Sequence, residues 1–205
     1  MEFGFNGKYY LMVLNTICLK KPTAAIWRFW PVLLGPMAML CVYLAEKLGH
    51  LQSFGRSSNE SIALLLLAVP TIGFIVQAFI FRSEFHLFML VLCAAFFCRE
   101  WHFPGTSQGI YVTLAVLVLW AVKRKDKFET LVKNSPLEVW LWSTFWTYLL
   151  SQLIARRVFR SLHLPAEELM HVFLEESVET TGHLMMIVIC IIAWKKAAEL
   201  KKQSI

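Results

Sequence analysis

The sequence has little charge for its length and almost no aspartate. Charged residues make up 17% of the 205 positions, against about 25% in ordinary soluble domains. Asp126 is the only aspartate among the 14 acidic residues. Hydrophobic residues reach 58%, more than one soluble core of this length is expected to bury. The scarcity of charge therefore argues against an ordinary soluble domain and predicts that much of the chain is solvated by lipid.

Several functional signatures are also missing. There is no HExxH motif, and the first 28 residues lack a small-residue cleavage site, so we expect them to form a short interfacial segment and not a signal peptide. The net charge of +6 does not indicate nucleic acid, because lysines and arginines that flank membrane spans give the same excess. The cysteines show neither metal-ligand spacing nor a disulfide pattern, and we interpret them as small apolar residues: Cys18, Cys41, Cys93, Cys98 and Cys190.

What the sequence does contain is six apolar runs. They predict an all-α fold, a polytopic membrane bundle of about six transmembrane helices, in one domain covering residues 1–205. About 20 residues cross a bilayer core. The fourth run is the shortest, and the sixth predicts a long final helix. The runs are 29–48, 61–81, 85–103, 109–122, 136–155 and 165–194.

The distribution of lysine and arginine predicts the orientation of these spans. With six spans, one side of the membrane holds 14 of the 20 basic residues. Because cytoplasmic loops carry the basic excess, both termini are predicted to lie in the cytoplasm, with the chain in a bacterial inner membrane. Five spans would separate the basic clusters at 123–127 and 195–202. The six basic residues on the other side are Lys47, Arg56, Arg99, Arg156, Arg157 and Arg160.

Acidic and histidine side chains follow one face of the predicted last helix. At about 100° per residue, spacings of 3, 4, 4 and 4 keep five of them within an arc of roughly 120°. Counting back from Trp194 at the cytoplasmic interface, Glu179 and His183 fall about 6 and 12 Å inside the outer leaflet. A helix that projects into solvent would explain the stripe only as far as Glu176, which borders it. The stripe consists of Glu168, His171, Glu175, Glu179 and His183.

A second charged cluster closes the third predicted span. It lies about 20–24 Å along that helix from the cytoplasmic start, at the same side and depth as the acidic stripe. A simple interfacial ion pair is the alternative interpretation. One arginine cannot neutralise four glutamates, so either a metal joins them or some glutamates stay protonated. The agreement in depth predicts one site made of Arg99, Glu100, His102, Glu175, Glu176 and Glu179.

These two clusters resemble the paired signatures of a family of small bacterial inner-membrane proteins. That family has an Arg-Glu-x-x-Phe-His type stretch at the end of one span and a Glu-Glu-x-x-Glu stretch at the start of the last. The corresponding stretches here are 99–103 and 175–179. His102 precedes Phe103, whereas the family has the opposite order. The resemblance implies a shared site in the inner membrane, but it does not identify a reaction.

Three functions of different classes are compatible with such a site. The first is a metal-dependent membrane hydrolase acting on a lipid or lipid-linked substrate, because Glu and His bind Zn, Fe or Mn and a bound water becomes a nucleophile. Glu168 and His171 match half of a di-iron motif, but no second half is present. The predicted metal ligands are His102, Glu100, Glu175, Glu179 and His183.

The other two functions need no metal. The chain could be a proton- or cation-coupled carrier or sensor, because lines of Glu and His serve as proton relays in membranes. It could also be an accessory subunit whose polar stripe pairs with a membrane-protein partner or with a second copy of itself. Membrane lipid is an expected partner in all three cases, and nucleic acid is not.

Overall fold

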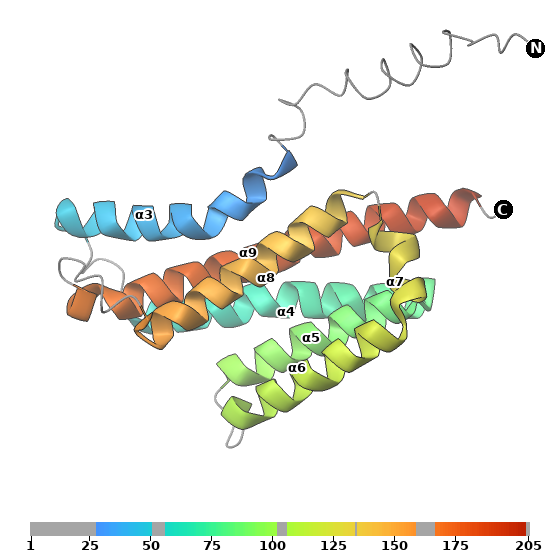
Figure 1. Cartoon of the computed structure of the whole chain (residues 1–205), viewed down its shortest axis with the longest axis horizontal. Helices are drawn as coiled ribbons and strands as arrows, with labels where there is room; N and C mark the ends of the chain where they lie inside the picture. Colours follow the sequence, from blue (N-terminus) through green and yellow to red (C-terminus); the bar gives the residue numbers. More distant parts are fainter. Residues whose placement is uncertain (1–27, 51–55, 102–105, 134, 159–166, 204–205) are drawn as a thin grey trace, which may run out of the picture.

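A computed structural model of the chain describes residues 28–50, 56–101, 106–133, 135–158 and 167–203. Over these ranges the structure contains helices and no strand (Figure 1). This confirms the all-helical fold class. The elements are η1 (Trp30–Leu33, a 3-10 turn), α3 (Leu34–Lys47), α4 (Arg56–Phe81), α5 (Glu84–Glu100), α6 (Thr106–Lys123), α7 (Lys125–Val132), α8 (Pro136–Ala155) and α9 (Glu167–Gln203).

The six longer helices lie side by side and alternate in direction (Figure 1). α3, α5 and α8 run one way, and α4, α6 and α9 run the other way. The bundle therefore has two ends. We call them the α7 end, where α7 packs against α5, α8 and α9, and the Arg99 end, where α5 and α8 finish. Arg28 also lies at the α7 end, because its guanidinium donates a hydrogen bond to the Ser135 carbonyl at 3.4 Å.

The predicted apolar runs coincide closely with these helices. α8 has the predicted bounds of 136–155, and its start is set by Ser135, whose hydroxyl accepts a hydrogen bond from the Leu137 amide, followed by Pro136 in the first turn. α9 continues nine residues beyond the predicted end at Trp194. The shortest predicted run becomes an 18-residue helix, α6. Residues 1–27, which hold nearly all of the predicted interfacial segment, lie outside the described residues.

Among the residues that the structure describes, two segments have the length and composition needed to cross a membrane. They are Ser61–Phe81 on α4 and His171–Gln203 on α9. Length and composition therefore do not by themselves show the six crossings that the sequence predicts.

Polar groups lie inside the bundle while large apolar side chains cover much of its outside. Phe79 and Val122 are 78% and 73% exposed. The buried polar residues, in contrast, sit between helices, and several expose none of their surface. They are Gln77, His86, Ser135, Ser143, Thr144, Thr147, Ser151, Glu179 and His183. Between them lies an apolar core that includes Leu67, Phe74, Met89 and Ile189.

Candidate functional site

The predicted site centres on an ion pair between α5 and α9. Arg99 Nη1 lies 2.7 Å from Glu179 Oε1, and Arg99 Nη2 donates to Glu179 Oε2 at 3.4 Å. The Arg99 side chain is 25% exposed and that of Glu179 is 11% exposed. Arg99 stands in the last turn of α5, where the free carbonyls of the helix favour a cation. The two clusters that the sequence placed at the same depth therefore meet through these two residues.

Further carboxylates surround this ion pair. Glu100 follows Arg99 at the end of α5, and Glu175 lies one turn before Glu179 on α9; both act electrostatically on Glu179. Glu100, Glu175 and Glu176 are all half-buried and all have interaction partners. The carboxylates around Glu179 thus outnumber the one guanidinium that it contacts.

A second polar pair lies one turn further along α9. The Tyr148 hydroxyl on α8 and His183 Nδ1 are 2.7 Å apart. His183 is fully buried, and its Nε2 has no hydrogen-bond partner among the described residues. The Tyr148 ring stacks on Phe96, with ring centroids 4.5 Å apart and planes 10° apart. A Cβ at Gly182 would lie 3.0 Å from the Tyr148 ring, so glycine lets α8 and α9 approach closely here without displacing the ring.

The remaining residues of the predicted stripe on α9 are His171 and Glu168. His171 Nε2 lies 3.2 Å from Arg157, which follows α8. The side chain of Glu168 and all of His102 fall outside the described residues. The apolar residues Leu174, Val178, Met185 and Ile189 of α9 are all buried in the bundle as well.

The predicted metal site remains a prediction. In the described ranges, no group of three or more His, Cys, Asp or Glu side chains is arranged to hold a metal ion. His102, one of the predicted ligands, is not among these residues. His183 already uses Nδ1 for Tyr148, so Nε2 is the nitrogen left for a metal, an arrangement usual for histidine ligands.

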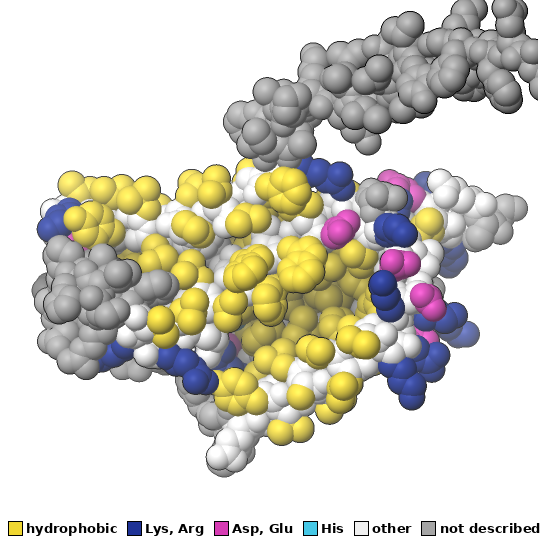
Figure 2. Space-filling view, viewed as in Figure 1, with side chains coloured by type: hydrophobic (Ala, Val, Ile, Leu, Met, Phe, Trp, Pro, Cys, Tyr) yellow, Lys and Arg dark blue, Asp and Glu magenta, His cyan; other side chains and the backbone are white. Residues whose placement is uncertain are grey.

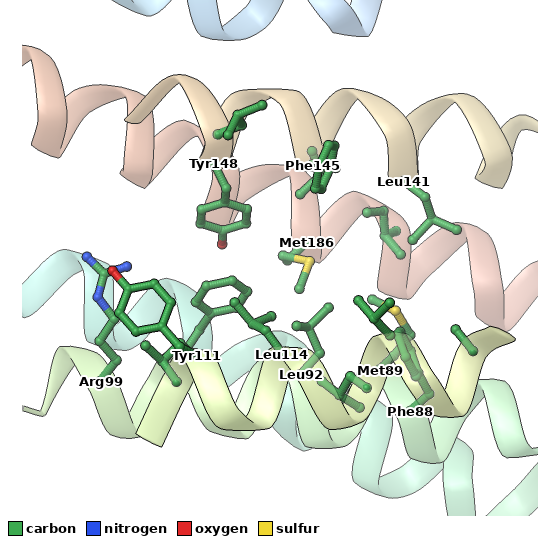
Figure 3. Close-up of a pocket in the computed structure, with 18 of the residues that line it drawn as sticks. Phe88, Met89, Leu92, Arg99, Tyr111, Leu114, Leu141, Phe145, Tyr148 and Met186 are labelled. Atoms are coloured by element: carbon green, nitrogen blue, oxygen red, sulfur yellow. The ribbon is translucent and has the colours of Figure 1, made fainter. Parts of the chain in front are cut away.

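Beside the polar cluster lies a long apolar groove between α5, α6, α8 and α9. Its volume is about 670 Å³, within the range of ligand pockets. The hollow lies on a face of the molecule covered by apolar side chains (Figure 2). Phe88, Met89 and Leu141 line it toward the α7 end, and Leu92, Leu114, Phe145 and Met186 line its middle (Figure 3).

Among the described residues that line this groove, Arg99 is the only charged one. It stands at one extremity next to Tyr111, and the Tyr148 hydroxyl points into the space between the helices (Figure 3). Gln152, at the same end of α8, is a further polar lining residue. The groove is therefore polar at the Arg99 end and apolar over the remainder of its length, apart from Thr144.

Comparison with known proteins adds no family or function. No protein-family model, curated protein or solved structure matches the chain.

Arg99, Glu179 and His183 were predicted from the sequence, whereas Tyr148 and the groove were not. One signal for Tyr148 was present, because a tyrosine deep inside a predicted span, away from the interface where tyrosines gather, needs a hydrogen-bond partner. The glycine before His183 was a second signal, since an interior helical glycine often marks a close helix contact. The groove had no signal, because it arises from the splay between helices that are distant in sequence.

Proposed function

We propose that this chain is a polytopic protein of a bacterial inner membrane, with α3, α4, α5, α6, α8 and α9 as spans and the α7 end in the cytoplasm. The alternating directions of these helices support six crossings. The exposed apolar surface and polar interior support lipid as the surrounding solvent. The lysines and arginines of 123–127 and 195–202 gather at the α7 end, as cytoplasmic segments require.

We propose further that the protein acts on a lipid or a lipid-linked substrate. The observation that carries this proposal is the groove, which offers one hydrocarbon-sized apolar channel ending at Arg99 and its partner Glu179. An amphipathic molecule fits such a channel with its chain along the apolar part and its polar head at Arg99, whose partner is Glu179. The reaction we favour is hydrolysis, with a carboxylate or a metal-bound water at the head group.

A divalent metal would extend this proposal. Its support is the excess of carboxylates around a single guanidinium, which costs free energy unless a cation or protons compensate it. The ligands would be Glu100, Glu175 and Glu179, with His102, and the three glutamates would have to move closer together than they lie in the structure to hold the ion. Stoichiometric Zn, Fe or Mn in the purified protein, lost in Glu175→Ala, is the expected result of metal analysis, and metal-free active protein would remove the metal from the mechanism.

The test of substrate class uses purified protein and native mass spectrometry of bound lipid. Leu114→Trp fills the groove, whereas Leu119→Trp adds the same side chain to an exposed position on the same helix. We expect wild type and Leu119→Trp to retain a bound lipid and Leu114→Trp to lose it. Equal retention in all three proteins would show that the groove does not hold the lipid and would overturn the proposal.

The test of reaction compares lipids extracted from wild type and from Glu179→Gln. A variant whose site binds but cannot react should accumulate a lipid that wild type converts, so the two extracts should differ in one species. Identical extracts from the two proteins would contradict an enzymatic role and leave a binding role.

A proton-coupled carrier is the second candidate, and specific observations favour it. Tyr148 and His183 form a short hydrogen bond beside Glu179, Gln77 Nε2 donates to the Cys190 carbonyl at 3.1 Å, and His86 is buried near the α7 end with no hydrogen bond at either ring nitrogen among the described residues. Such a row could carry protons through the bundle. Proton uptake by vesicles containing the protein, abolished by His183→Phe, would establish this function in place of hydrolysis.

The accessory-subunit hypothesis loses its main support. It needs the polar stripe at a surface that meets a partner, and Glu179 and His183 are instead buried between α9 and its neighbours.

A further inference from the structure

The polar end of the groove carries a second guanidinium that sequence analysis did not connect with the site. Arg156 caps the end of α8, and its Nη2 donates a hydrogen bond to the Tyr111 hydroxyl at 3.3 Å. Tyr111 lines the groove. Arg156 is exposed, so Tyr111 links a cation at the mouth of the groove to the lining itself.

The two arginines differ in how their charge is compensated. Arg99 contacts Glu179 through two nitrogens. Arg156 forms no ion pair within the described part of the chain, where its hydrogen bond goes to an uncharged phenol. As far as the described residues go, the mouth of the groove therefore has a positive charge with no acidic partner, next to a neutral hydroxyl.

The carboxylates of the site do not neutralise the positive charge at this end of the groove, because they do not line it. Glu100, Glu175, Glu176 and Glu179 are all absent from the lining of the groove. Arg99 lines the groove and contacts Glu179, which does not line it, through Nη1 and Nη2. A molecule in the groove thus meets arginine, tyrosine and glutamine before it meets a carboxylate.

We infer that the groove binds one hydrocarbon chain of an anionic phospholipid, with the phosphate between Arg99 and Arg156 and the chain end near Phe88. This inference rests on the proposed function and names its substrate class. Guanidinium groups bind phosphate through paired, charge-assisted hydrogen bonds, and the Tyr111 hydroxyl is free to donate a further one. From Arg99 to Phe88, α5 offers a path of about 16 Å for the chain.

The first experiment tests the direction of the lipid. The probe is phosphatidic acid with a photoreactive diazirine at the end of one acyl chain, added to the purified protein in detergent. With the phosphate at the Arg99 end, peptide mapping should find the label near Met89, Val122 and Leu141. Labelling near Tyr111 and Gln152 instead would place the phosphate at the lysines of the α7 end and would overturn the inference.

The second experiment tests the charge of the head group by native mass spectrometry. Phosphatidic acid and diacylglycerol with identical chains are compared, and inorganic phosphate is added as a competitor to separate a lipid head from a free ion. We expect phosphatidic acid to bind about tenfold more tightly than diacylglycerol, the effect of about one charge-assisted hydrogen bond. Millimolar phosphate should compete only weakly, because it lacks the chain.

Two adjacent arginines provide a matched pair of variants. Arg156→Gln should remove most of the preference for phosphatidic acid, while Arg157→Gln should leave it intact, because Arg157 contacts His171 and not the groove. Equal binding of both lipids to wild type, or equal effects of the two substitutions, would refute the anionic head group while leaving the groove as a lipid site. A separate result tests whether the groove binds lipid at all. If Leu114→Trp binds lipid as well as wild type does, the groove is not the lipid site.

Discussion

Arg99 and Glu179 join the end of α5 to the middle of α9 through nitrogen–oxygen contacts of 2.7 and 3.4 Å. Because both side chains are mostly buried, each is the main compensation for the charge of the other. Removing one partner leaves an uncompensated charge in a medium of low dielectric constant. Removing both takes away the buried cation and its contacting anion together.

We therefore predict that Arg99→Met lowers the free energy of unfolding by about 2–3 kcal/mol, somewhat below the cost for a fully buried pair because Arg99 is partly exposed. Arg99→Met combined with Glu179→Leu should recover most of that loss. Arg124→Gln is the control, because its pair with Glu84 spans 3.6 Å at a 53% exposed side chain and should cost about 0–1 kcal/mol. Denaturant unfolding in detergent measures all three, and additive losses in the double variant would contradict the pairing.

The hydrogen bond between Tyr148 and His183 gives a second prediction. Tyr148→Phe keeps the stacking on Phe96 but leaves His183 Nδ1 buried without a partner, which should cost about 1–3 kcal/mol. Adding His183→Leu removes the orphaned nitrogen, so the double variant should be more stable than Tyr148→Phe alone. The same unfolding measurement decides this, and a double variant less stable than either single one would contradict it.

Gly182 sets the spacing between α8 and α9 at this level. In Gly182→Ala the new Cβ would lie 3.0 Å from the Tyr148 ring, and we expect a loss of about 1–3 kcal/mol as the ring is displaced. Gly109→Ala is the matched control, because nothing lies within 4 Å of a Cβ there and alanine favours a helix. A thermal shift that is negative at Gly182 and zero or positive at Gly109 is the expected outcome.

Most of the helices could be predicted because their apolar runs are long and bounded by charge or proline. α7 could not, because its short sequence of four charged residues and one apolar face resembles a loop until Phe128 and Leu131 are seen to pack against the core. The extension of α9 past Trp194 was missed for a similar reason. Its lysine-rich continuation has the composition of a tail, although it keeps a helical periodicity that buries Ala197.

The pairing of Arg99 with Glu179 could be predicted from depth and side alone, since both positions follow from the helical rise along predicted spans. The partner of His183 could not. Tyr148 lies 35 residues away on α8, and the rotation of that helix about its axis is the reverse of what an apolar core predicts. The buried face of α8 carries Ser143, Thr144, Thr147 and Ser151, whereas Trp142, Phe145 and Trp146 are exposed. The groove depends on such rotations in four helices at once.

The orientation across the membrane is a further prediction. Reporter fusions at Ser107 and Ser161 should be active only in the periplasm, and a fusion at Asp126 should be active only in the cytoplasm, because the basic cluster at 123–127 resists export. Alkaline phosphatase and fluorescent-protein fusions provide the two opposite readouts. A periplasmic Asp126 would reverse the orientation and move the site to the cytoplasmic leaflet.

The contact between α4 and α9 at Gly73 gives the last prediction. A Cβ at Gly73 would lie 2.5 Å from Cys190 Sγ, so Gly73→Ala must displace the thiol and disturb the hydrogen bonds that Gln77 Nε2 donates to Cys190. We expect a loss of about 1–3 kcal/mol in the free energy of unfolding. Cys190→Ala alone should cost less, because it removes one atom and leaves the backbone carbonyl as an acceptor for Gln77. The double variant, Gly73→Ala with Cys190→Ala, relieves the contact because no thiol remains for the new methyl group to displace. Its loss of stability should therefore be smaller than the sum of the two single losses.

A double-mutant cycle measures this difference, and we expect a favourable coupling of at least about 0.5 kcal/mol. Strict additivity would mean that α4 and α9 do not approach each other at Gly73 as the structure describes.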